Sequence, residues 1–235
     1  MTTQTDTTST TTSQGQWKGS NLKVGGNTSL TSDNDLNIEG SNVATGGQLA
    51  LNASNINITA GKNTLTESTE SHSEGANASY GITNGSVSGG INANQSSSDS
   101  QSVTHINSQL VAANLVSKSD NLTIAGGKLD AASIDITTDQ LVVTSLQDTS
   151  SSHSESLGGN IGAGGDGISN IGVNASQSEA ERAWVAQQSG ITGGQVTIKA
   201  KDTAITGGVI AAVDEQGQTT DKLTLTTERN NTGQA

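Results

Sequence analysis

Several residue types that usually build or stabilise a protein interior are missing from this chain of 235 residues. It has no cysteine, no proline and no phenylalanine, and aromatic residues make up 1% of it. Without cysteine there are no disulfides and no thiol chemistry, so stability must come from backbone hydrogen bonds and packing. Hydrophobic residues reach only 30%, which is too few for an ordinary globular core and is typical of disordered chains.

Basic residues are also scarce. The net charge is −12, and residues 64–105 contain no Lys or Arg. This excludes nucleic acid as a partner and argues against docking to an anionic lipid surface, because both need basic side chains. No apolar run approaches the roughly 18 residues of a transmembrane helix. Residues 2–5 are polar, so no signal peptide follows Met1, and we expect Met1 to begin a fragment of a longer chain.

What the chain does have is periodicity. Gly19–Leu22 and Gly40–Val43 open two successive units with one shared pattern, in which short apolar-x-apolar steps are separated by Gly, Asn, Asp or Ser. Only strands, with their period of two, fit such steps. The steps are Leu22/Val24, Thr28/Leu30 and Leu36/Ile38, then Val43, Leu49/Leu51 and Ile56/Ile58.

A unit of about twenty residues cannot bury one face by itself, so its apolar side chains must stack on those of the next unit. The sequence therefore predicts an all-β protein, a parallel β-helix solenoid with Leu, Ile and Val inside and Ser, Thr and Asn facing water. About six coils, stacked roughly 4.8 Å apart, give a body on the order of 30 Å long.

The pattern returns twice further along the chain. Later apolar steps include Leu110, Leu115, Leu122/Ile124, Leu129, Ile134/Ile136 and Leu141/Val143, then Ile191, Val196/Ile198, Ile205, Val209 and Leu223/Leu225. We predict one β-helical segment over residues 1–235, an excerpt of a longer array. Its coils occupy residues 17–66, 106–144 and 188–227, and its two insertions occupy residues 67–105 and 145–187.

The first insertion predicts a β-hairpin. Alternating apolar or small residues flank Asn84-Gly85, a pair that tolerates the positive φ of a type I′ turn. A two-residue turn there pairs Ile82 with Val87, and also Tyr80 with Gly89, Ala78 with Ile91 and Ala76 with Ala93, so that the apolar positions share one face.

The second insertion repeats the first in outline. Ser71–Glu74 recurs as Ser152–Glu155, and Ile91–Ser96 recurs as Val173–Ser178, at spacings of 81 and 82 residues. Its hairpin sets Ala163 against Ile171 and Ile161 against Val173, with an odd-numbered loop between. The Thr-rich residues 1–16 resemble the tail of a preceding insertion, which extends as a strand only if another segment pairs with it.

The chain resembles the haemagglutinin repeats of two-partner-secreted exoproteins, the filamentous haemagglutinin family, including its contact-dependent growth inhibition members. Gly40–Gly47, Asp33–Ile38 and Thr69–Ser73 with the alternation that follows carry the likeness. The resemblance implies a secreted, right-handed β-helical filament on a Gram-negative surface. It also implies an outer-membrane two-partner transporter during secretion, and a receptor or the outer membrane of a neighbouring cell as partner.

Several motifs that could carry chemistry have structural explanations. His72 with Glu74 and His153 with Glu155 offer two metal ligands each, without a third nearby. The segment Gly164–Ile168 is similar to a calcium-binding repeat, but that motif works only in tandem. Asp33-Asn34-Asp35 suits a turn, Asn37 and Asn57 suit an Asn ladder, and Thr224 and Thr226 do not recur as an ice-binding face would require. We predict no catalytic, cofactor-binding or metal residues and no cofactor.

The leading interpretation is a structural or adhesive filament segment without catalysis. The alternative, which rests on the resemblance, is a membrane-active segment that helps deliver a toxin across a target cell's outer membrane. The third is a polysaccharide-active β-helix enzyme, although two Trp and one Tyr give few sugar platforms. We expect the hairpins to lie half-buried against the coils rather than to act as transmembrane strand pairs.

Overall fold

The computed structural model describes residues 1–82 and 85–227, which form two compact units. The coil unit contains residues 16–63, 104–148 and 184–227, and the strand unit contains residues 1–15, 64–103 and 149–183. None of the described residues is helical. The chain therefore passes between the two units several times.

The coil unit is a parallel β-helix, as the sequence predicts. Its strands are β2 (Asn21–Val24), β3 (Thr28–Thr31), β4 (Asp35–Glu39), β5 (Asn42–Thr45), β6 (Gln48–Asn52), β7 (Asn55–Thr59), β10 (Ser108–Lys118), β11 (Asn121–Ala125), β12 (Gly127–Thr144), β15 (Gly190–Thr206), β16 (Val209–Ala212) and β17 (Leu223–Thr227). These strands pair in parallel with the equivalent strands of the neighbouring coils.

The apolar steps stack in register, which explains how so few hydrophobic residues make a core. One ladder contains Thr28, Leu49, Leu115, Ile134, Val196 and Leu223. A second contains Leu22, Val43, Leu110, Leu129, Ile191 and Ile210. A third contains Ile38, Ile58, Ile124, Val143 and Ile205. The middle members of these ladders are buried, whereas Leu22, Ile205 and Leu223 at their ends are exposed.

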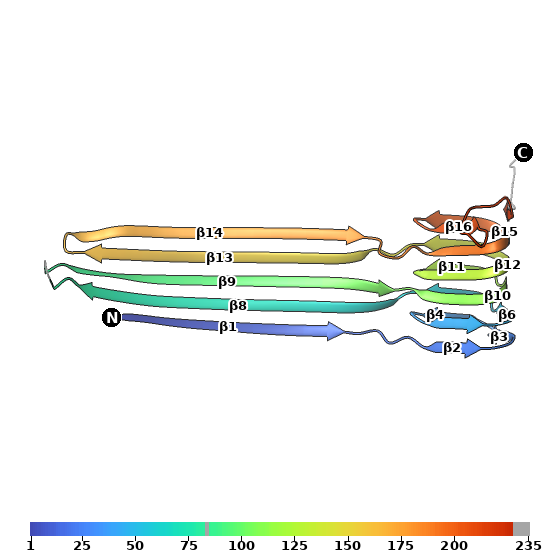
Figure 1. Ribbon diagram of the computed structural model, residues 1–235, viewed down its shortest axis with the longest axis horizontal. Helices are drawn as coiled ribbons and strands as arrows, with labels where there is room; N and C mark the ends of the chain where they lie inside the picture. Colours follow the sequence, from blue (N-terminus) through green and yellow to red (C-terminus); the bar gives the residue numbers. More distant parts are fainter. Residues whose placement is uncertain (83–84, 228–235) are drawn as a thin grey trace, which may run out of the picture. The chain divides into compact units, whose positions relative to one another are not determined.

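The strand unit is one antiparallel sheet of long strands. Its members are β1 (Thr2–Gly15), β8 (Gly61–Tyr80), β9 (Val87–Ile106), β13 (Asp148–Gly164) and β14 (Gly167–Trp184). They lie side by side in the order β1-β8-β9-β13-β14 (Figure 1). The Thr-rich arm becomes a strand because it pairs with β8, from Thr2 opposite Asn77 to Gly15 opposite Thr64.

The predicted register of the first hairpin is wrong by two residues. The backbone N–H of Gly81 donates to the carbonyl of Ser86 (2.7 Å), and the hydroxyls of Ser79 and Ser88 lie 2.7 Å apart, which sets Tyr80 opposite Val87. The Gly85 N–H bonds to the Gly81 carbonyl at 2.8 Å and closes a wider loop than the two-residue turn. Gly85 has the expected positive φ, 69°, while Asn84 lies outside the described residues.

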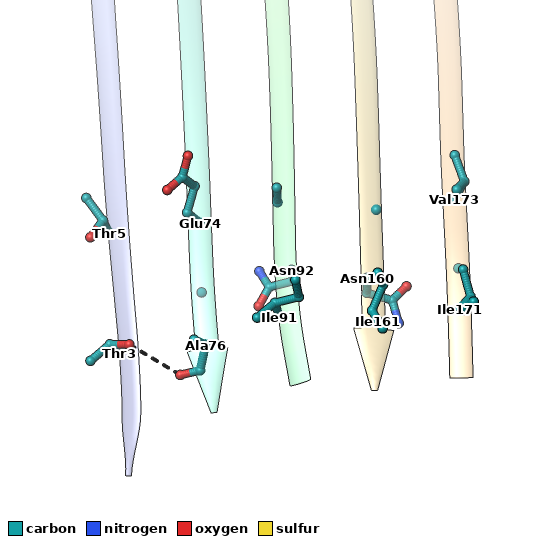
Figure 2. Close-up of a pocket in the computed structure, with 14 residues that line it drawn as sticks. Thr3, Thr5, Glu74, Ala76, Ile91, Asn92, Asn160, Ile161, Ile171 and Val173 are labelled. Atoms are coloured by element: carbon teal, nitrogen blue, oxygen red, sulfur yellow. Dashed lines mark hydrogen bonds between the residues drawn. The ribbon is translucent and has the colours of Figure 1, made fainter. Parts of the chain in front are cut away.

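The second hairpin is shifted from its predicted register in the same way. The Ser176 hydroxyl lies 3.2 Å from that of Ser156, a contact that sets Ile161 opposite Ile171 rather than opposite Val173. Figure 2 shows these two isoleucines level with each other on β13 and β14. A shift of two residues keeps every side chain on its predicted face, so both hairpins still gather their apolar residues on one side.

The strand unit has no hydrophobic core in the part of the chain that the structure describes. Every buried hydrophobic side chain among the described residues lies in the coil unit. The expectation that the hairpin residues are half-buried is therefore wrong, because Tyr80, Ile82, Val87 and Ile91 are 66%, 92%, 57% and 59% exposed. Backbone hydrogen bonds and cross-strand side-chain pairs hold this sheet together.

Candidate binding surface

Apolar side chains gather on one face of the strand unit, which we call the isoleucine face. Two adjacent rows cross the sheet there (Figure 2): Thr3, Ala76, Ile91, Ile161 and Ile171, then Thr5, Glu74, Ala93, Gly159 and Val173. Ile91, Ile171 and Val173 remain more than half exposed. Exposed apolar patches rimmed by polar residues mark interaction sites.

A shallow hollow of about 590 Å³ lies over these rows. It forms because Ala93 and Gly159 have little or no side chain, while isoleucines rise beside them. Its rim is polar on the β1 side, where the Thr3 hydroxyl donates to the Ala76 carbonyl at 3.4 Å. Glu74 supplies a carboxylate. The hollow thus offers an apolar floor and one acidic group, which suits binding better than catalysis.

On the opposite face of the same sheet, asparagine side chains lie over glycines of neighbouring strands. A Cβ on Gly75 would come within 2.5 Å of the Asn92 side-chain oxygen, and Gly172 faces Asn160 in the same way. The Asn160 amide also donates to the Asn170 oxygen at 2.7 Å. Small glycines leave room for amide contacts across the strands.

In each of the two His-x-Glu elements, the His and Glu side chains lie close together on their own strand. His72 Nε2 lies 2.6 Å from Glu74 Oε1, and His153 Nε2 lies 3.1 Å from Glu155 Oε1. These side chains are largely exposed. Among the described residues, no group of three or more His, Asp or Glu side chains could hold a metal ion. Solvated pairs of this kind contribute little stability.

One carboxylate of the strand unit shows a perturbed pKa. The Ser73 hydroxyl, and then the Gln4 amide, donate hydrogen bonds that lower the pKa of Asp6 from its usual value. Asp6 is fully exposed, so this shift reflects local hydrogen bonding in the β1–β8 pair and not a catalytic environment.

The remaining candidates occupy structural positions. The Asn57 amide donates to the Asn37 oxygen at 2.9 Å, which confirms the asparagine ladder. Asp35 accepts from Asn55 in the next coil at 2.8 Å instead of capping its own turn. The segment Gly164–Ile168 forms the end of the second hairpin, where Gly167 has a φ of 109°. Thr224 and Thr226 are exposed on β17, opposite Thr197 and Lys199.

Two buried serines were missed by the sequence analysis. The Ser108 hydroxyl donates to the Thr59 carbonyl at 2.7 Å and accepts the Ser41 N–H at 3.1 Å. The Ser189 hydroxyl donates to the Thr144 carbonyl at 2.6 Å and accepts the Gly126 N–H at 2.8 Å. Each lies where the chain re-enters the coils after an insertion. Their spacing of 81 residues, equal to that of Ser71 and Ser152, was the available signal.

Comparison with known families fits this architecture. The family model described as the hemagglutinin repeat matches residues 1–159. The chain belongs to this family. The match runs from the first residue of the chain through the first hairpin and the coils after it, and into β13. Membership in the hemagglutinin-repeat family supports a structural or adhesive filament segment of a secreted surface exoprotein.

The other comparisons give no match. No curated protein and no solved structure matches the chain. In the part of the chain that the structure describes, no helix has the length and apolarity needed to cross a membrane.

Proposed function

We propose that this hemagglutinin-repeat chain is a structural and adhesive segment of a large exoprotein on the surface of a Gram-negative bacterium. The observation that carries the proposal is a difference in burial between its two units. The coil unit holds the buried core, whereas the strand unit exposes apolar side chains and contains no buried hydrophobic side chain among its described residues. A unit with a packed core suits a supporting role, and a sheet with exposed apolar side chains suits adhesion.

The isoleucine face is the adhesive surface in this proposal. Its apolar floor and polar rim resemble the centre and edge of a protein interface. The partner is a receptor on a neighbouring cell, and an outer-membrane two-partner transporter carries the parent protein out of the bacterium. Membership in the hemagglutinin-repeat family supports a role without catalysis.

Binding of the purified chain to erythrocytes tests this function. We expect saturable binding that falls about tenfold or more in the double variant Ile91→Asp/Ile171→Asp, because a few central apolar residues supply most of the affinity of an interface. The matched control is Asn92→Asp/Asn174→Asp, which adds the same charges on the opposite face. Equal loss in both variants, or no binding by the parent chain, would contradict the proposal.

A second candidate function is membrane-active delivery in contact-dependent growth inhibition. One observation favours it: Ile82 and Val87 at the end of the first hairpin are exposed, at 92% and 57%. Release of a trapped dye from phosphatidylcholine vesicles tests it. We expect no release from the purified chain. Release that Ile82→Asp/Val87→Asp abolishes would favour delivery over adhesion. The polysaccharide-active enzyme has no supporting observation in the described residues.

A further inference from the structure

The outer edge of β14 is equivalent to an edge that is paired elsewhere in the same sheet. β9 and β14 are the second strands of their hairpins. The second strand β9 pairs with β13, the first strand of the next hairpin, from Val103 opposite Thr149 to Gly89 opposite Ala163. β1 pairs with the first strand β8 in the same antiparallel way. No described strand pairs with the outer edge of β14.

The direction of the backbone N–H groups on β14 follows from the hydrogen bonds between neighbouring strands. Met1 and Ala78 exchange both hydrogen bonds, at 2.7 and 2.8 Å, so even-numbered residues of β8 bond to β1 and odd-numbered ones bond to β9. The bond from Gly81 to Ser86 agrees. The β9–β13 and β13–β14 registers extend this alternation across the sheet. On β14, the even-numbered residues therefore bond to β13, and the N–H groups of the odd-numbered residues, from Ile171 to Glu181, point outward.

The side chains of the two edges also correspond. His153 on β13 lies directly opposite Asp99 on β9. The sequence repeat that aligns Ile91–Ser96 with Val173–Ser178 aligns Asp99 with Glu181. Glu181 is exposed, and its N–H is one of those that point outward. Glu181 on the outer edge of β14 therefore occupies the position at which Asp99 on β9 faces His153.

We propose that the outer edge of β14 binds the first strand of a further hairpin of this repeat, which adds antiparallel to the sheet with its Ser-His-Ser-Glu element at Glu181. Such strand addition takes affinity from main-chain hydrogen bonds and register from the side chains. The occupant is an extended Ser-rich strand of the β8 or β13 type. This inference concerns an edge and is independent of the isoleucine face.

Continuity with the existing pairings favours this occupant over the others. In a second copy of the chain, β8 lies between β1 and β9, and β13 lies between β9 and β14, so neither first strand is available without displacement. A lipid surface is disfavoured because Arg182 is the only Lys or Arg of the strand unit, whereas acidic side chains occur on all five strands. β14 contains no lysine or proline, the residues that most often block edges, and its charged side chains are confined to Glu179, Glu181 and Arg182 near its end.

A labelled synthetic peptide with the sequence of residues 148–164 is the probe, and fluorescence anisotropy measures its binding to the full chain. We expect saturable binding that falls at least about tenfold in Gln177→Pro, since proline removes an outward N–H and obstructs the edge. The control Gln4→Pro alters the outer edge of β1, because the Met1–Ala78 pair points even-numbered N–H groups of β1 outward. We expect it to bind the peptide like the parent chain.

A charge exchange tests the register. Glu181→Lys in the chain should weaken binding of the parent peptide, and the peptide change His153→Glu should restore it. Each change should shift the affinity by about two- to fivefold, the scale of one cross-strand charge pair. Peptide binding that Gln177→Pro leaves intact, binding lost equally in Gln4→Pro, or a full chain that forms dimers through β14 in place of binding the peptide would each overturn the proposal.

Discussion

The carboxylate of Asp148 accepts a hydrogen bond from the backbone N–H of His105 at 2.7 Å and lies 3.2 Å from Nδ1 of the same residue. Asp148 is only 5% exposed. The two residues are 43 positions apart in the sequence, and each lies close to the boundary where its strand passes from one unit to the other. The pair therefore ties together the chain segments at both of these crossings within the coil unit.

Replacing Asp148 tests how much this pair contributes. Asp148→Ala leaves the part-buried His105 N–H without its acceptor, which costs about 1–2 kcal/mol. Asp148→Asn retains an oxygen acceptor and should lose less. The measurement is the midpoint of urea unfolding. Asp130→Ala is the control, because Asp130 is exposed and lies 3.8 Å from Lys128 in a surface ion pair. Equal midpoints for Asp148→Ala and Asp130→Ala would contradict this role.

The buried serines give a second prediction. Ser108→Ala removes the acceptor of the Ser41 N–H and the donor to the Thr59 carbonyl, and Ser189→Ala does the same for Gly126 and Thr144. Ser108→Ala should be less stable by about 1–3 kcal/mol, the cost of leaving the Ser41 N–H without its acceptor. Ser189→Ala should lose about 0.5–1.5 kcal/mol, because the Gly126 N–H keeps its hydrogen bond to the Thr144 carbonyl at 3.2 Å. Ser98→Ala, at an exposed position of β9, should unfold at the parent midpoint. Two serine variants as stable as Ser98→Ala would argue against hydroxyl bridges between coils.

Burial of the ladder gives a third prediction. Ile136 is fully buried and stacks between Ser117 and Ile198. Ile136→Asp places an unpaired carboxylate in the core, which costs several kcal/mol, and should unfold the neighbouring coils. Thr137→Asp adds the same charge at the adjacent exposed position and should be nearly neutral. Circular dichroism melting curves compare the two. Superimposable curves would show that the inward face is assigned incorrectly.

The coils could be predicted closely because a solenoid repeats its constraints. Leu49 and Leu115 occupy matching places in their coils, and the structure pairs them. The faces of the hairpins could also be predicted, because alternation fixes which side a residue occupies. Their registers could not, since a shift of two residues leaves Tyr80 and Val87 on the same face. The hydrogen bonds from Gly81 to Ser86 and from Gly85 to Gly81 fix the observed register, and the sequence contains no pattern that predicts them.

The buried polar contacts could not be predicted for a different reason. Ser108 and Ser189 share the 81-residue spacing of the repeat, but that spacing does not show that they are buried, because burial depends on where the chain re-enters the coils. His105 was passed over because its partner Asp148 is distant in sequence. The exposed isoleucine face was predicted as a shared face, but its exposure was not, since exposed apolar side chains normally indicate a missing partner.

The last prediction concerns amide hydrogen exchange, which reports local opening. Amides of the buried coil ladders, such as Leu129 and Ile134, should exchange orders of magnitude more slowly than those of the strand unit, whose described residues contribute no buried hydrophobic side chain.

The outer edge of β14 gives a more specific exchange pattern. On β14 the N–H groups of Asn174 and Ser176 bond to β13, whereas those of Val173 and Ala175 point outward, so protection should alternate from residue to residue. Residue-resolved exchange measured by NMR provides the test, with β9 as the internal control because it is paired on both sides and should show no such alternation. Alternation in the opposite phase would mean that the β13–β14 register is off by one residue, and uniform slow exchange along β14 would mean that its outer edge is already paired in solution.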